Sequence, residues 1–66
     1  IDMCEFTVYL DGHEDENIVA TNVVKIKDRG DRLSLMDSAG KSYRIENAVV
    51  ASVDSIMAEL LLKTKA

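Results

Sequence analysis

The chain has 66 residues, which is room for one domain with a small hydrophobic core and marginal stability of its own. Its 12 acidic and 8 basic residues give a formal net charge of −4, which disfavours nucleic acid as a partner because neutralising phosphates takes clustered Lys and Arg. A hydrophobic content of 47% argues against disorder, and no apolar run approaches the ~18 residues of a membrane span.

The N-terminal residues contain no basic region and no long apolar core, so we expect no signal peptide. Met3 is expected to be the natural start, with Ile1 and Asp2 as an added remnant and residues 3–66 as a single domain. Cys4 is the only cysteine, and a reduced lone cysteine suits a cytoplasmic protein. Since it cannot form an internal disulfide, oligomerisation or a metal ion is the expected source of extra stability.

The first predicted strand covers residues 3–10. Its even positions are apolar and its odd positions are polar or amphipathic, which is the pattern of a strand with one buried face. The pattern points the thiol toward the core side, at the open end of the strand. The inward-facing residues are Cys4, Phe6, Val8 and Leu10, and the outward-facing residues are Glu5, Thr7 and Tyr9.

Short strands separated by turns are predicted for most of the remaining chain. They cover residues 18–20, 23–27, 32–36, 42–45 and 48–53. The residues expected to face inward are Val24, Ile26, Leu33, Leu35, Tyr43 and Ile45. The β-branched run at 48–53 is expected to be buried on both faces, and the acidic run at 14–16 to be a solvated loop.

The local signals leave residues 56–63 open between helix and strand. Asp54 and Ser55 could cap a helix, and the composition that follows favours one. The same residues also alternate with period two. With six or so short strands, the sequence predicts an all-β sandwich or barrel. No proline protects its edges, which indicates pairing with a second copy.

The Met3-Cys4 start, the strand that it opens and the run of short strands resemble the CooT family, whose members are small proteins that begin Met-Cys. Residues 49–54 and 60–63 resemble that family's last two strands. The resemblance implies an SH3-like or Sm-like barrel of six to seven short antiparallel strands, and it turns the expectation for 56–63 from helix to strand. It also implies a homodimer that binds nickel through Cys4.

In the best-known members of that family the context is nickel delivery to carbon monoxide dehydrogenase. The resemblance therefore implies nickel handling without catalysis, with one Ni(II) per dimer. Thiolate and nitrogen donors suit Ni(II), and a two-fold dimer could bring two Cys4 thiolates together. Ile1 and Asp2 would move the free amine away from such a site. The competing interpretation of Cys4 is a small buried apolar residue.

His13 is the other soft donor, and a solvent-exposed loop histidine is the competing interpretation. The chain shows no Cys-His or Ser-His-Asp constellation, and its glycines are isolated, so we do not expect an enzyme.

The alternative function is RNA binding, because family members have also been described as predicted RNA-binding proteins. An Sm-like barrel could stack a base on Tyr9 or Tyr43 while basic side chains contact phosphate. Those side chains are Lys25, Lys27, Arg29, Arg32, Lys41 and Arg44. An ordinary solvated face is the competing interpretation of these residues. A module that adds a strand to a partner's sheet is a third possibility.

Overall fold

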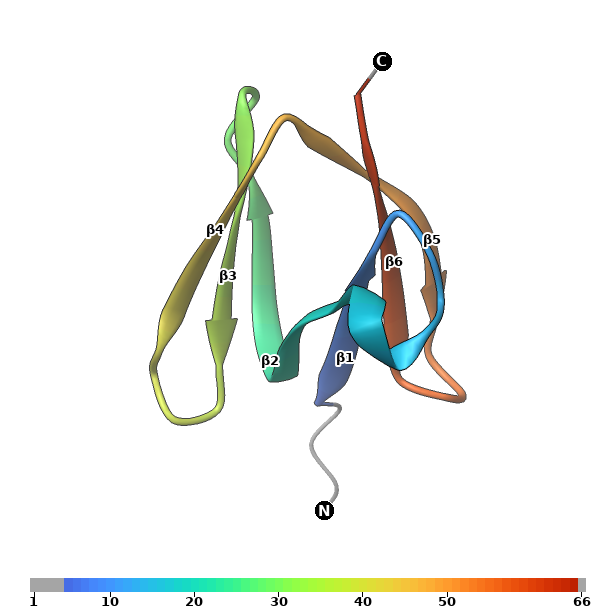
Figure 1. Cartoon of the computed structure of the whole chain (residues 1–66). Helices are drawn as coiled ribbons and strands as arrows, with labels where there is room; N and C mark the ends of the chain where they lie inside the picture. The colour runs from blue at the N-terminus through green and yellow to red at the C-terminus, as the bar shows by residue number, and fades with distance from the viewer. Residues whose placement is uncertain (1–4, 66) are drawn as a thin grey trace.

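The computed structural model describes residues 5–65, and its architecture is all-β (Figure 1). The strands are β1 (Phe6–Leu10), β2 (Ile18–Asp28), β3 (Arg32–Asp37), β4 (Ser42–Glu46), β5 (Ala48–Asp54) and β6 (Glu59–Thr64). One turn of 3₁₀ helix, η1 (Asp15–Asn17), stands in the acidic loop. Within the described residues no helix has the length and apolar character that crossing a membrane requires.

The six strands form one curled sheet in the order β4-β3-β2-β1-β6-β5 (Figure 1). β1 and β6 are parallel, and the other neighbouring pairs are antiparallel. The sheet does not close into a full barrel, because β4 and β5 each pair with one neighbour only. These edge strands are joined at Asn47, whose φ of 57° turns the chain sharply. Asn47 is held there by Asp31 and Lys65, through backbone hydrogen bonds of 3.2 and 2.8 Å.

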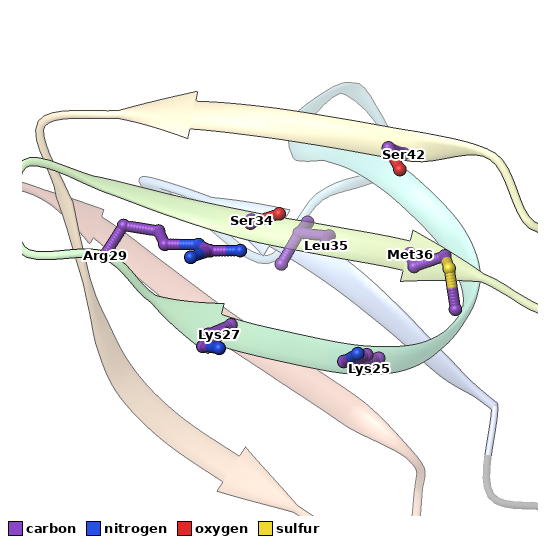
Figure 2. A pocket seen from close by; sticks show the side chains of 7 residues that line it. All are labelled: Lys25, Lys27, Arg29, Ser34, Leu35, Met36 and Ser42. Atoms are coloured by element: carbon purple, nitrogen blue, oxygen red, sulfur yellow. The ribbon is translucent and has the colours of Figure 1, made fainter.

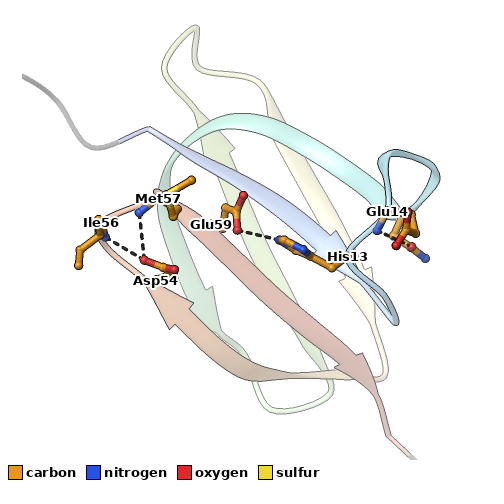
Figure 3. A network of polar contacts seen from close by, with 7 residues as sticks. His13, Glu14, Asp54, Ile56, Met57 and Glu59 are labelled. Carbon is orange, nitrogen blue, oxygen red and sulfur yellow. Dashed lines mark hydrogen bonds and ion pairs between the residues drawn. The ribbon is translucent and has the colours of Figure 1, made fainter.

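The strand prediction for residues 56–63 is confirmed from Glu59 onward, since β6 covers Glu59–Thr64, whereas residues 56–58 form a turn. The predicted capping residue Asp54 does cap, but it caps a turn. Its Oδ1 accepts the backbone N–H groups of Ile56 and Met57, both at 3.0 Å (Figure 3). The chain then reverses and pairs with β5, so residues that have helical propensity become a strand through tertiary pairing.

The core lies on the inner side of the curled sheet. The predicted inward alternation of β1 and β3 is confirmed, because Val8, Leu33 and Leu35 are almost fully buried. Phe6, Leu10, Tyr43 and Ile45 are half-buried against this cluster, also as predicted. The full cluster consists of Val8, Ala20, Val23, Leu33, Leu35, Ala48, Leu60 and Leu62.

The predicted alternation of β2 is confirmed only in part. Ile26 pairs with the inward-facing Leu35, so it points inward as predicted, although it is 38% exposed. Val23, which was not predicted to face inward, is buried, and Val24 is only half-buried. The cause is a β-bulge: Val23 pairs with Asp37 and Lys25 with Met36, which leaves Val24 as an extra residue. The two short segments predicted for this region are thus one 11-residue strand that pairs first with β1 and then with β3.

The prediction that residues 48–53 are buried on both faces is also wrong. Ala48 is buried, but the rest of β5 is exposed, including Val49, Val50 and Val53. The reason is that β5 is an edge strand, with β6 on one side only. Its β-branched composition therefore leaves apolar side chains on the surface.

Candidate functional site

Cys4, the one predicted metal ligand, lies outside the described residues. The structure does describe the backbone that leads to it. Glu5 Oε1 accepts a hydrogen bond of 2.8 Å from Asn22 Nδ2, and Phe6 pairs with Val23 of β2. The described chain thus enters the sheet at the end where β1 begins, and Glu5 is the residue that follows Cys4 in sequence.

Exposed apolar side chains gather at this end of the sheet. A groove of about 230 Å³ is lined by Phe6, Val53 and Ile26, among others. The adjoining β5–β6 turn carries Ile56, which is 91% exposed, and Met57. This turn lies beside the start of β1, because Thr7 N donates to the Ala58 carbonyl at 2.9 Å. We call Ile26, Val53, Ile56 and Met57 the apolar patch.

His13 lies on the outer side of the sheet, where it contacts Glu59, the β6 residue that pairs with Thr7 of β1. Its Nε2 is 2.7 Å from Glu59 Oε1 (Figure 3). Its ring centroid is 4.5 Å from that of Tyr9. The predicted outward orientation of Tyr9 is correct, yet the residue is 9% exposed because His13 covers it. Burial, followed by the charges of Glu59 and Asp15, raises the pKa of Tyr9.

The pair formed by His13 and Glu59 does not make a metal site by itself. Within residues 5–65, no group of three or more His, Cys, Asp or Glu side chains is arranged to hold a metal ion. The His13 side chain is 59% exposed. The exposed-loop interpretation of His13 fits this arrangement, with Glu59 as a surface partner.

Most of the predicted basic residues share one surface, the outer face of β2–β4. Lys41 is the exception, because its Nζ lies over the ring of the half-buried Tyr43, 5.2 Å from the ring centroid. A groove of about 220 Å³ crosses the outer face, lined by Lys25, Lys27 and Arg29 from the β2 side and by Ser34 and Ser42 from β3 and β4 (Figure 2). The cations were predicted from the sequence as candidate binding residues, whereas the two serines were not. Alternation along β3 and β4 was the signal for them, since each serine shares a face with a basic neighbour two residues away.

The two tyrosines proposed for base stacking do not join this surface. Tyr9 is packed against His13 on β1. Tyr43 is half-buried against the core, and its hydroxyl donates to Asp37 Oδ2 at 3.1 Å. That hydrogen bond, together with burial, raises the pKa of Tyr43. Phe6, the remaining aromatic residue, also faces the core. The described basic surface therefore has no aromatic side chain on which an RNA base could stack.

Residues 3–63 match the family model described as CO dehydrogenase accessory protein CooT. The structure is similar to the crystal structure of a protein proposed to be CooT from Carboxydothermus hydrogenoformans, with a TM-score of 0.80 and 17% identity. That match covers 96% of this chain and 100% of the other and, at this identity, shows the fold alone. No curated protein sequence matches the chain.

The fold defines the chain as a small all-β protein with one curled, six-stranded sheet. Together with the match over residues 3–63, this confirms the resemblance found at the Met3-Cys4 start. The chain belongs to the CooT family, which is a family of CO dehydrogenase accessory proteins. An accessory family rather than a catalytic one agrees with the expectation that the chain is not an enzyme.

Proposed function

We propose that this protein is a nickel-binding accessory protein that holds Ni(II) through Cys4 in a homodimer and passes the ion to CO dehydrogenase. The observation that carries the proposal is the position of the start of β1. Glu5 is tied to Asn22 there, and the apolar patch lies beside it. The only thiol in the chain is the next residue toward the N-terminus.

The apolar patch supports the homodimer. Ile56 and Met57 are large apolar side chains on a turn, where solvent exposure costs free energy and burial against a second copy would recover it. A chain of 66 residues has a small core, so the folded monomer gains little stability from it. Association with a second copy would add to that stability. Phe6 lines the groove that adjoins this patch. Two-fold pairing through the patch would therefore bring the two β1 starts, and with them two Cys4 residues, close together.

The choice of nickel follows from donor chemistry. A thiolate and a backbone nitrogen from each of two chains would supply four donors, and sulfur and nitrogen donors in a square-planar arrangement suit Ni(II). The carboxylate of Glu5 adds negative charge next to Cys4 in sequence. Metal binding that needs the dimer would stabilise it, because the binding free energy adds to that of association.

Titration calorimetry with Ni(II) tests the proposal, with a chain that begins at Met3 and its Cys4→Ser variant. We expect about one ion per dimer, and binding weakened at least about a hundredfold by the loss of the thiolate. His13→Gln is the matched control, because it removes the other soft donor, which is paired with Glu59 on the outer side of the sheet. Equal binding by the Cys4→Ser variant would refute the assignment of Cys4.

A further inference from the structure

The outer surface of β2, β3 and β4 carries most of the basic side chains of the chain. We call Lys25, Lys27, Arg29, Arg32 and Arg44 the basic face. The strand register aligns them, since Lys27 is paired with Ser34 and Ser34 with Arg44. Residues two apart on a strand point to the same side, so Lys25 and Lys27 project together from β2.

Part of this positive charge is neutralised within the chain and part is not. Arg32 contacts Asp31 at 2.9 Å, and Arg44 contacts Glu46 at 2.6 Å. Lys25, Lys27 and Arg29 form no ion pair with any other described residue. These three cations line the groove together with the hydroxyl groups of Ser34 and Ser42 (Figure 2). The groove therefore offers unneutralised charge and neutral hydrogen-bond donors to an anionic partner.

The charge of the protein is strongly segregated. Residues 18–46 hold six of the eight basic residues and four of the twelve acidic ones. The rest of the chain holds two basic and eight acidic residues. The net charge of −4 thus conceals a positive surface on β2–β4 and a negative remainder. Such a distribution orients the molecule toward a negatively charged partner during diffusional encounter.

We infer that the basic face docks on an acidic protein surface, and that this surface belongs to CO dehydrogenase. The inference rests on the proposed function, which makes that enzyme the recipient of the ion. An acidic protein surface fits better than RNA because Tyr9 and Tyr43 lie away from the basic face, which leaves bases without a stacking partner. Carboxylates need only the cations and hydroxyl groups that the groove provides.

Lys25 connects the docking surface to the proposed nickel site. It lines both the basic groove and the apolar groove that contains Phe6. Ile26, its neighbour, belongs to the apolar patch and points to the other side of β2. A dimer formed through the patch would therefore leave the basic face open, with the start of β1 near the edge of the docked partner.

The test measures binding of the nickel-loaded protein to purified CO dehydrogenase from the same organism by biolayer interferometry. We expect the double variant Lys25→Glu and Lys27→Glu to weaken binding at least about tenfold, mainly through a slower association rate. We also expect the wild-type affinity to fall when NaCl is raised from about 50 to about 300 mM, because salt screens exposed charges. Lys27→Glu and Lys63→Glu are matched single reversals, and only the first should weaken binding.

Three results would overturn the inference. They are the absence of wild-type binding, equal losses for Lys27→Glu and Lys63→Glu, and saturable binding of polyuridylate that the double variant abolishes. The last would assign the face to RNA. Nickel titration of the same variants separates this inference from the proposed function. The double variant should bind Ni(II) like the wild type, so a docking failure with intact nickel binding counts against the docking surface alone.

Discussion

Asp11 and Thr64 are joined by two hydrogen bonds, although 53 positions separate them in sequence. Asp11 Oδ1 accepts the Thr64 backbone N–H at 2.8 Å, and Oδ2 accepts the Thr64 hydroxyl group. Asp11 directly follows β1, and Thr64 is the last residue of β6. The contact thus links the end of β1 to the end of its parallel neighbour β6, both of which lie inside the sheet. The two bonds from Thr64 lower the pKa of Asp11 below its ordinary value of 3.8.

Asp11→Asn should reduce stability near neutral pH, and the deficit should shrink in acid. Because the pKa of Asp11 is lower in the folded chain, its ionised form stabilises the fold above about pH 4, and that contribution is lost as the pH falls through the folded pKa. Asparagine tolerates the positive φ of 58° at this position. Urea unfolding of both proteins between about pH 7 and pH 3 measures the difference. A deficit that does not change with pH would contradict the prediction.

Leu35→Ala should lower the free energy of unfolding by about 2–5 kcal/mol, because it leaves a cavity where a 1% exposed side chain now packs. Val49→Ala on the exposed edge strand is the control. There we expect a loss below about 1 kcal/mol. Urea denaturation at constant m-value measures both changes. Similar losses at the two positions would mean that the core is not on the side of the sheet described above.

Ala58→Gly should raise the free energy of unfolding by about 0.5–1 kcal/mol. Ala58 has a φ of 55°, in the left-handed region where a Cβ atom is unfavourable and glycine is not. Its carbonyl accepts from Thr7, a bond that the substitution leaves in place. Ala51→Gly in β5 provides the contrast, since glycine within a strand should destabilise by a similar amount. Destabilisation by Ala58→Gly would show that this turn has another conformation.

The double variant Ile56→Asp and Met57→Asp should be monomeric and still folded. Both side chains are exposed on the β5–β6 turn, so the fold should not depend on them, whereas like charges in a two-fold interface repel. Light scattering after size-exclusion chromatography gives the mass, and far-UV circular dichroism checks the fold. A variant that stays dimeric would exclude the apolar patch as the interface.

The strands were predictable from the sequence where alternation is uninterrupted. Leu33 and Leu35 are the clearest case, because each turn beside β3 also carries glycine. In β2 the faces of Lys25, Ile26 and Lys27 were predictable, but the burial of Val23 was not, since it depends on a bulge that forms only on pairing with β3. The exposure of β5 was missed for a similar reason. A β-branched run has the same composition at the centre and at the edge of a sheet, and only the strand order separates the two.

The candidate site was predictable only in part. Cys4 and a group of cations on β2–β4 could be identified from the sequence, and the structure brings Lys25, Lys27 and Arg29 together at one groove. The apolar patch was missed because Ile56 and Met57 fit a helix as well as a turn, until pairing with β5 decides between them. The packing of His13 against Tyr9 was also missed. This contact joins a strand residue to a loop residue, and the loop has no periodic pattern from which the contact could be predicted.

X-ray absorption spectroscopy at the nickel edge tests the central claim most directly. The sample is the chain that begins at Met3, loaded with one Ni(II) per dimer, and the comparison is with the Cys4→Ser variant. We predict sulfur bonded directly to nickel in the first protein and only nitrogen and oxygen in the second, since Cys4 is the only cysteine. A spectrum without a sulfur neighbour in the first protein, or identical spectra from the two, would contradict the assignment of Cys4 as the nickel ligand.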